Sequence, residues 1–316
     1  MTTSTTSATS TILVTGATGQ VGRRLVPRLL SWRTPVAPGA QPAEQVRVLV
    51  RTQHAADGFV AAGAQAIVGD VTDAADRKRA LDGVDVVVNS AATFRSPDIT
   101  QADMDAVNRD AALALARESA EAGVRRFVQI STNLVYGPGV GRPVREDDPL
   151  RAEIGYPRSK REAEELLEGL REETGFGVVT LRLAFVYGDG DPHIENYLPR
   201  VTARPGHAQL VMVHHADVAQ AVLHAIHVPG IEGRAYNIAG DGASTAFELH
   251  EMVGIRPEPT TTAGTGGAAG DPATFTGSTT AEDPWFGVPD TTRAFRELGF
   301  RPIYPTARAA WRVGVL

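Results

Sequence analysis

The segment "TILVTGATGQVGRRL", residues 11–25, decides the fold. It starts as a short apolar, β-branched run that ends in glycine, which predicts a buried strand over 11–16. Apolar residues then return at helical spacing over 20–32, with Pro27 as a predicted kink. The sequence therefore predicts a strand, a glycine-rich turn and a helix in immediate succession.

Three glycines at intervals of three occupy that turn, namely Gly16, Gly19 and Gly22. Glycine permits a tight turn and a close approach of the backbone to a pyrophosphate, while the helix N-terminus supplies free N–H groups and a positive dipole end. The spacing is G-x-x-G-x-x-G and not the common G-x-G-x-x-G. We interpret the turn as a dinucleotide-binding loop, the alternative being a plain turn built from small residues.

Strands and helices alternate along the rest of the chain. Further strands are predicted at 46–51, 64–70, 84–92, 125–132, 177–186 and 234–240, with helices at 104–123, 156–173, 215–227 and 291–302. This alternation is typical of an α/β fold, a Rossmann-type doubly wound parallel sheet with helices on both faces.

A small C-terminal substrate-binding lobe is expected beside that sheet, because the alternation loosens after residue 187. We assign 1–10 to a disordered tail, 11–184 plus 216–244 to the dinucleotide-binding domain, and 185–215 plus 245–316 to the lobe. The Thr/Gly/Ala/Pro-rich stretch 259–284 predicts a mobile loop within that lobe.

The composition excludes several classes of function. The 316 residues include no cysteine, which rules out disulfides, thiolate metal sites and a cysteine nucleophile. The net charge of −6 gives no electrostatic case for nucleic acid or an anionic membrane as partner. The polar start of the chain does not resemble a signal peptide, and no apolar run could span a bilayer, so we expect a soluble cytoplasmic protein.

Arg51, at the end of the second predicted strand, indicates which dinucleotide is bound. NAD sites place a carboxylate there for the ribose 2′-hydroxyl, whereas an arginine suits the 2′-phosphate of NADP. We therefore expect NADP, with NAD possible; a solvated arginine at a strand end is the alternative. No metal is expected, because the late histidines His207, His214, His215, His224 and His227 show no ligand spacing.

Tyr156 and Lys160 stand four residues apart in "GYPRSKREAEELLEGL", a helical pattern. Residues at this spacing share one helix face, and an ammonium beside a phenol lowers the tyrosine pKa. The pair would then be an acid able to work near neutral pH. Alternatively, they are two ordinary surface residues.

An ordered set of motifs resembles the extended short-chain dehydrogenase/reductases, also called the NAD-dependent epimerase/dehydratase family. The motifs are "TGATGQVG", "GDVTD" (69–73), "NSAAT" (89–93), "VNRDAA" (107–112), "GVRRFVQISTNLVYG" (123–137), "YPRSK", "LRLAFVYG", "VHHADVAQAV", "YNIAG" and "RELGFRP". The resemblance covers nearly the whole chain.

The resemblance implies roles for particular residues. Tyr156 would be the acid/base, and Lys160 would hold the nicotinamide ribose and lower the tyrosine pKa. Thr132 would be the catalytic hydroxyl, with its neighbour Ser131 as the alternative; strand alternation allows only one of them to face the site. The residues expected to bind the cofactor are Gly16, Thr18, Gly19, Gln20, Val21, Gly22, Arg51, Asp70, Val71, Ser90, Ala91, Ala92, Asn108, Tyr156, Lys160 and Phe185.

Departures from the family pattern concern the substrate. Dehydratases of the family carry Asp-Glu after the catalytic Thr, where Asn133 and Leu134 stand here. Nucleotide-sugar enzymes often have an asparagine at the place of Phe185 and an arginine near Leu210, and neither residue here can hold a diphosphate. These absences favour a small, partly apolar substrate. Arg200 and Arg204 are still candidate phosphate ligands. The alternative for Phe185 and Leu210 is that they only pack in the core.

We therefore expect an NADP(H)-dependent enzyme that interconverts a ketone and an alcohol by Tyr/Lys/Thr acid–base chemistry. The alternative is an epimerase that works through a transient keto intermediate with retained NAD. A dinucleotide sensor without catalysis is less consistent with the Tyr–Lys pair. Family members often form homodimers through the two long helices, here 104–122 and 156–173, and the small apolar run "ALALA" (112–116) suggests such a partner surface.

Overall fold

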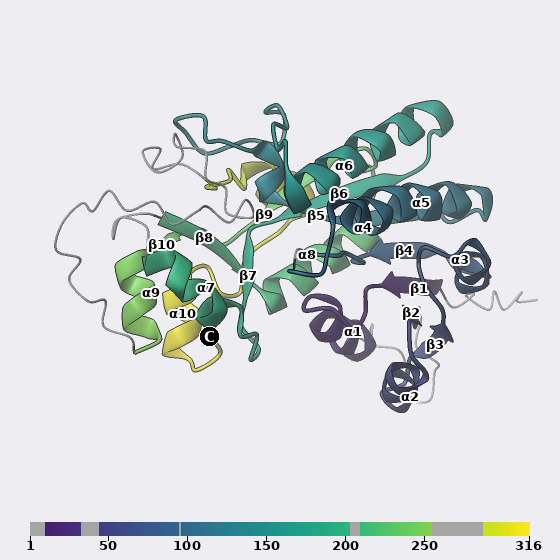
Figure 1. Ribbon diagram of the computed structural model, residues 1–316, viewed down its shortest axis with the longest axis horizontal. Helices are drawn as coiled ribbons and strands as arrows, with labels where there is room; N and C mark the ends of the chain where they lie inside the picture. The colour runs from purple at the N-terminus through teal and green to yellow at the C-terminus, as the bar shows by residue number, and fades with distance from the viewer. Residues whose placement is uncertain (1–9, 33–43, 95, 203–208, 255–286) are drawn as a thin grey trace, which may run out of the picture.

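The computed structural model describes residues 10–32, 44–94, 96–202, 209–254 and 287–316. Residues 1–9 of the predicted tail and the whole predicted loop 259–284 lie outside these ranges, while Ser10 already belongs to the first strand. The alternation of strands and helices predicted above is present in the described chain (Figure 1).

A seven-stranded parallel sheet forms the centre of the molecule. Its order is β3-β2-β1-β4-β5-β6-β9, and every pairing between neighbours is parallel. The strands are β1 (Ser10–Thr15), β2 (Glu44–Val50), β3 (Gln65–Val68), β4 (Val86–Asn89), β5 (Arg126–Thr132), β6 (Val178–Leu183) and β9 (Ala235–Ile238). The predicted Rossmann-type doubly wound sheet is confirmed.

The order of strands reverses next to β1, which lies between β2 and β4. In an open parallel sheet, ligands bind in the crevice outside the carboxyl ends of the strands at such a switch point. Here β1 ends at Thr15, opposite Asn89 of β4. Residues 16–22, which we call the glycine loop, directly follow β1. The topology therefore places this loop at the crevice.

Helices cover both faces of the sheet and bury two separate cores (Figure 1). Because side chains alternate along a strand, Ile12 and Val14 of β1 enter one core while Leu13 enters the other. The first core receives α1 (Gly22–Ser31) and α8 (His215–His227), and the second receives α3 (Ala74–Leu81), α5 (Ala112–Glu121) and α6 (Gly155–Thr174). The remaining elements on the sheet are α2 (Gln53–Ala61), α4 (Gln101–Asp105), and the short turns η1 (Ala106–Ala111), η2 (Asn133–Tyr136) and η3 (Ala294–Leu298).

A second sheet has three strands in the order β10-β8-β7. They are β7 (Phe185–Tyr187), β8 (Gln209–His214) and β10 (Ala243–Thr245), with α7 (His193–Thr202), α9 (Ala246–Met252) and α10 (Ala307–Arg312) around them. The single strand predicted over 177–186 is wrong, because the chain leaves the large sheet after Leu183 and continues as β7. The proposed boundaries between two domains stay a prediction.

The predicted helix over 104–123 is also more complex than its pattern suggests. It consists of α4, the π-helical turn η1 and α5, and Asn108 lies inside the π turn. Within "ALALA", Ala112, Leu115 and Ala116 are buried in this chain's own core, at 1%, 0% and 0% exposure. The run is therefore not the exposed apolar surface we expected, and it no longer argues for a partner.

None of the helices in the described part of the chain is long and apolar enough to cross a membrane.

Candidate active site

The glycine loop has a geometry that only glycine permits at two positions. Gly16 has a φ of +66°, and a Cβ there would lie 2.5 Å from the backbone nitrogen of Ala91. A Cβ on Gly22 would lie 2.2 Å from the carbonyl oxygen of Gly16. Helix α1 begins without a side-chain cap and with no acidic residue in its first turn, so its N-terminal N–H groups suit an anion. The loop fits the phosphates of a dinucleotide.

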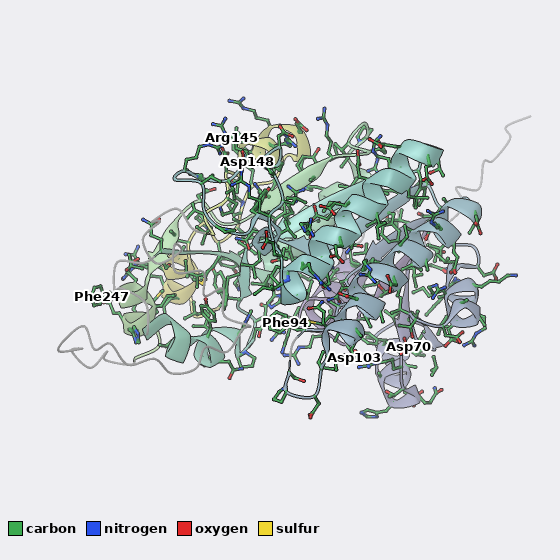
Figure 2. All side chains as sticks on the ribbon, turned by 45° about the horizontal axis from the view of Figure 1, so that its top comes forward. Asp70, Phe94, Asp103, Arg145, Asp148 and Phe247 are labelled. Atoms are coloured by element: carbon green, nitrogen blue, oxygen red, sulfur yellow. The ribbon has the colours of Figure 1, made fainter. Side chains whose placement is uncertain are left out.

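Other predicted cofactor residues lie where the parallel strands end. Ser90 follows β4 and donates from Oγ to the carbonyl oxygen of Thr15 over 2.6 Å. Asp70 follows β3, and its Oδ1 accepts from the backbone N–H and the hydroxyl of Thr72 at 2.8 and 2.7 Å (Figure 2). Arg51 is exposed directly after β2. Seven more predicted cofactor residues directly follow β1, β3 or β4: Thr18, Gly19, Gln20 and Ala92 are exposed, Val21 and Val71 are partly buried and Ala91 is buried.

Tyr156 and Lys160 lie in the first two turns of α6, which packs against β5 and η2. Lys160 is only 2% exposed. Tyr156 is partly buried, and its ring centroid lies 4.9 Å from that of Phe94. Phe94, labelled in Figure 2, is itself 64% exposed. Sequence reasoning overlooked Phe94, whose only signal was an aromatic residue directly after a predicted cofactor-lining strand.

Burial dominates the titration of both groups. It lowers the pKa of Lys160 to about 8, against the opposing charge of Glu164, and it raises the pKa of Tyr156 to about 12. We expected Lys160 to lower the pKa of Tyr156, and this prediction is wrong, because burial raises that pKa instead. At neutral pH the phenol holds its proton.

The two adjacent hydroxyls at the end of β5 have different partners. Ser131 donates from Oγ to Glu164 Oε1 in the buried interior. Thr132 Oγ1 accepts from the backbone N–H of Leu134 over 3.2 Å, which leaves its own proton free to be donated. This division favours Thr132 as the functional hydroxyl.

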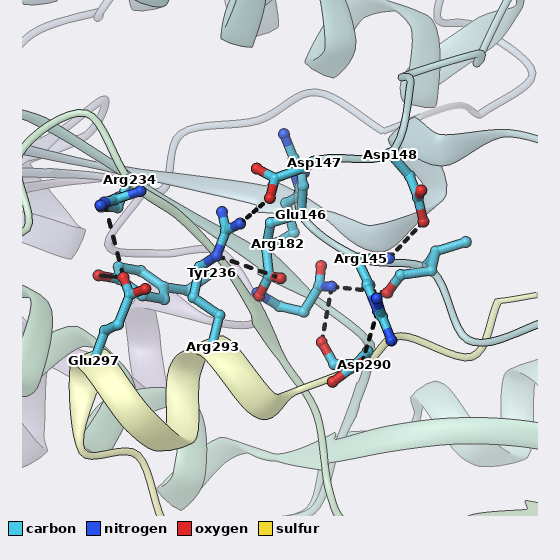
Figure 3. Close-up of polar contacts among 12 residues, drawn as sticks. Arg145, Glu146, Asp147, Asp148, Arg182, Arg234, Tyr236, Asp290, Arg293 and Glu297 are labelled. Atoms are coloured by element: carbon cyan, nitrogen blue, oxygen red, sulfur yellow. Dashed lines mark hydrogen bonds and ion pairs between the residues drawn. The ribbon is translucent and has the colours of Figure 1, made fainter.

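A buried ion pair lies beneath the tyrosine helix. Arg182 of β6 donates from Nε and Nη2 to Glu164 Oε2 at 2.9 and 2.8 Å, and both side chains are 7% exposed. Arg182 also donates from Nη1 to Tyr136 OH over 2.8 Å. Arg182 Nη1 also donates to the carbonyl oxygen of Glu146 over 2.9 Å. Beyond Glu146, Arg293 Nε lies 3.8 Å from Glu146 Oε2, and Arg293 pairs with Asp147 (Figure 3). The sequence signal for Glu164 was its position four residues after Lys160.

Asn108 connects two segments of the site. Its Oδ1 accepts from the backbone N–H of Thr93 over 2.7 Å, and its Nδ2 donates to the carbonyl oxygen of Thr93 over 2.9 Å. The same Nδ2 lies 3.0 Å from Ser159 Oγ. Its role is therefore to join the loop after β4 to the tyrosine helix.

Asn133, Phe185 and Leu210, which depart from the family pattern, each have specific contacts in the structure. Asn133 donates from Nδ2 to the carbonyl oxygen of Gly287 over 3.0 Å, a bond that an ionised aspartate could not make. Phe185 stacks on the ring of His193 at 4.0 Å, and both Phe185 and Leu210 pack against the core of the second sheet. The side chain of Arg200 and the whole of Arg204 lie outside the described residues.

The late histidines have separate partners. His215 contacts Asp191, His224 contacts the carbonyl oxygen of Leu298, and His227 contacts Glu44. His214 contacts the carbonyl oxygen of Val315, and His207 lies outside the described residues. Among the residues that the structure describes, no cluster could hold a metal ion.

The large sheet has the Rossmann-type strand order, and the glycine loop lies at its switch point. The NAD dependent epimerase/dehydratase family matches residues 12–239, and the chain belongs to this family. It is an enzyme of the extended short-chain dehydrogenase/reductase type, as the resemblance predicted.

Individual relatives differ in activity. A dTDP-glucose 4,6-dehydratase of Streptomyces griseus is 30% identical over 315 residues, which cover 93% of this chain and 90% of that protein. A farnesyl-dihydroquinoline-oxide ketoreductase of Stigmatella aurantiaca and a UDP-glucose 4-epimerase of Vibrio cholerae are each 34% identical over 185 residues. The match covers 51% of the ketoreductase and 56% of this chain, and 52% of the epimerase and 57% of this chain. This chain therefore spans about half the length of these two relatives.

Solved structures support the fold. A dTDP-glucose 4,6-dehydratase of Streptomyces venezuelae with bound NAD aligns with a TM-score of 0.74 at 23% identity, over 96% of this chain and 95% of that one. The UDP-glucose 4-epimerase of Thermotoga maritima aligns with a TM-score of 0.73 at 23% identity, over 96% of both chains.

Proposed function

We propose that this protein is an NADP(H)-dependent oxidoreductase that interconverts a ketone and an alcohol on a small, partly apolar substrate. The observation that carries the proposal is a buried lysine one helical turn after a partly buried tyrosine, on the helix that packs against the carboxyl end of β5. This is an acid–base pair beside a dinucleotide crevice.

The roles follow from the side chains. The nicotinamide cofactor, when bound, supplies hydride to the carbonyl carbon or accepts it from the alcohol. Tyr156 would give a proton to the carbonyl oxygen during reduction, for which a phenol that stays protonated at neutral pH is in the correct form. Thr132 would donate its hydroxyl proton to the same oxygen as a hydrogen bond. Lys160 would bind the nicotinamide ribose.

Arg51 supports the choice of NADP. An exposed guanidinium directly after β2 can bind the 2′-phosphate as a charge-assisted, bidentate partner. A carboxylate at this place would instead accept the 2′-hydroxyl of NAD.

Two exposed apolar side chains near Tyr156 support the proposed substrate class. Phe94 touches Tyr156, and Ile154, which directly precedes α6, is 53% exposed. Exposed apolar side chains beside a candidate acid favour a substrate with an apolar part. Dehydration is less well supported, because the amide of Asn133 is engaged with Gly287 and cannot act as an acid.

An epimerase is the second candidate, favoured by the match to the Vibrio cholerae UDP-glucose 4-epimerase, which equals the match to the ketoreductase in identity. The two activities differ in the fate of the cofactor. An epimerase keeps its NAD through the cycle, whereas a reductase exchanges its NADP after each turnover. Nucleotide extracted from the purified protein, identified by mass, distinguishes them.

A screen of ketones and alcohols with NADPH and NADH, read at the nicotinamide absorbance, tests the proposed reaction. We expect oxidation of NADPH with small, partly apolar ketones. Turnover of UDP- or dTDP-sugars without net change of the nicotinamide would favour the epimerase.

We also propose a homodimer through the two long helices 104–122 and 156–173, which correspond to α4–η1–α5 and α6, because members of the family often dimerise through these helices. Light scattering at micromolar concentration tests it, and a monomer mass would contradict it.

A further inference from the structure

A buried cluster of ionisable side chains joins the glycine-loop helix to the second sheet. Its members are Arg24 of α1, Asp191 in the loop after β7, and His215 at the start of α8, which are 8%, 7% and 2% exposed. His215 Nε2 lies 2.8 Å from Asp191 Oδ2, and Arg24 Nη1 lies 3.7 Å from the same oxygen. Three segments far apart in the sequence therefore meet at one carboxylate.

On one side, the cluster reaches the glycine loop. Arg24 donates from Nη1 to the carbonyl oxygen and to Oε1 of Gln20, at 3.1 and 2.8 Å. From Nε it donates to the carbonyl oxygen of Asp189 over 3.1 Å. One guanidinium thus holds a glycine-loop residue and the loop after β7 together.

On the other side, the cluster reaches α7. Asp191 Oδ1 accepts from the backbone N–H of His193 over 3.1 Å, at the first residue of that helix. The ring of His193 stacks on Phe185 at 4.0 Å. Asp191 therefore fixes the first turn of α7 with one oxygen and the glycine-loop helix with the other.

Burial of such a cluster is costly, and its net contribution to stability is small or negative compared with apolar side chains of equal volume. Stability alone is therefore a weak reason for this arrangement. The hydrogen bonds that leave the cluster reach Gln20 of the glycine loop, the loop after β7 and the first residue of α7.

We propose that Arg24, Asp191 and His215 are positioning residues that join the glycine loop to the first turn of α7, so that cofactor binding at the loop stabilises that turn. This inference rests on the proposed cofactor site but not on the identity of the substrate. Asp191 is the central member, because it contacts both other side chains.

Variants of Asp191 test this with NADPH as the probe. Asp191→Asn keeps the size of the side chain and an oxygen for the His193 N–H, but it leaves Arg24 without its buried counter-charge. We expect NADPH affinity to fall about tenfold, the equivalent of one misplaced phosphate hydrogen bond. We also expect NADPH to slow amide hydrogen exchange at 193–197 in the wild type and to have no such effect in the variant.

Arg28→Gln is the matched control. Arg28 lies one turn further along α1 and pairs with Asp189 at 2.8 Å, but these side chains are 33% and 26% exposed. It should leave both readouts unchanged. The double variant Arg24→Gln/Asp191→Asn removes both charges, so a purely structural role predicts normal affinity, whereas our inference predicts that affinity stays low.

The pH dependence provides a second test. The groups that face His215 and Asp191 are Arg24, Asp189 and His193. Burial lowers the pKa of His215 below 6.5, and its protonation would add a cation beside Arg24. NADPH affinity should therefore fall in acid more steeply in the wild type than in His215→Gln, which keeps an N–H donor. The 2′-phosphate of NADPH titrates in the same pH range, but it affects the wild type and His215→Gln equally, so the difference between their pH profiles reports His215.

The outcomes separate the two claims. Normal NADPH affinity and intact protection of 193–197 in Asp191→Asn would overturn the inference alone. If that variant fails to fold, identical pH profiles for wild type and His215→Gln would overturn it. A wild-type protein that binds neither NADPH nor NADH would overturn the proposed function and this inference together.

Discussion

Asn108 donates a hydrogen bond to Ser159 Oγ over 3.0 Å, and so joins the π-helical turn η1 to α6 one residue before Lys160. Ser159 in turn donates to the carbonyl oxygen of Tyr156 over 2.8 Å. Asn108 also binds both backbone groups of Thr93, which directly precedes Phe94. One amide therefore holds the tyrosine helix and the loop whose phenylalanine touches the tyrosine. Single π-helical turns within α-helices are frequently found at functional sites.

Replacing Asn108 by Leu should destabilise the protein by about 1–3 kcal/mol, because the N–H of Thr93 then loses its buried acceptor. Turnover should fall as well, since Tyr156 and Phe94 are no longer held relative to each other. Urea unfolding and steady-state rates measure the two effects. Ser159→Ala, which keeps both bonds to Thr93, should be milder in both, and equal effects would contradict this account.

Lys160 should destabilise the folded protein at neutral pH. Its pKa of about 8 in the fold lies below the 10.5 of free lysine. Between these values the unfolded chain binds more protons, so stability rises with pH, and charged Lys160 costs up to about 3 kcal/mol below pH 8.

Lys160→Met should therefore be more stable than the wild type at neutral pH, yet bind the cofactor more weakly. Urea unfolding between neutral pH and pH 10.5 checks this, because only the wild type should gain stability over the range set by the lysine. A variant that is less stable than the wild type at neutral pH would show that Lys160 has a stabilising partner.

The sequence predicted the fold well because the strand and helix periods of a buried parallel sheet are strong signals. It predicted the glycine loop for a similar reason, since Gly16 and Gly22 satisfy a steric requirement of the backbone. It misplaced the chain at 184–187, where an apolar run continues from one sheet into another. Periodicity gives no sign of that change of partner.

Side-chain chemistry was harder to predict. The sequence placed Ser131 and Thr132 side by side, but only the fold shows that Glu164 engages the serine. Burial reversed the expected shift of the Tyr156 pKa, because desolvation is a property of the packed interior. The cluster of Arg24, Asp191 and His215 has no local signature, since its members are far apart in the chain.

Arg51 should set the preference between cofactors. We expect NADPH to bind more tightly than NADH by about ten- to a hundredfold, since one charge-assisted contact contributes about 1.5–3 kcal/mol. Arg51→Asp should reverse the order. Titration of nicotinamide fluorescence measures both affinities, and equal affinities in the wild type would remove the reason for assigning NADP.

The two hydroxyls of β5 should separate in their effects. Thr132→Val removes the proposed donor to the carbonyl oxygen while keeping the shape, so turnover should fall. Ser131→Ala removes a hydrogen bond to Glu164, so stability should fall by about 1 kcal/mol while turnover changes little. Rates and urea midpoints for both variants check this. A larger loss of turnover in Ser131→Ala than in Thr132→Val would reverse the assignment.

The most direct test of the central claim compares the wild type with Tyr156→Phe on a ketone that the screen identifies, with saturating NADPH. The substitution removes one oxygen and keeps the ring beside Phe94, so folding and cofactor affinity should barely change. We predict a fall in turnover of about 10²–10⁴-fold, the contribution of a general acid. Normal turnover in Tyr156→Phe would contradict the account.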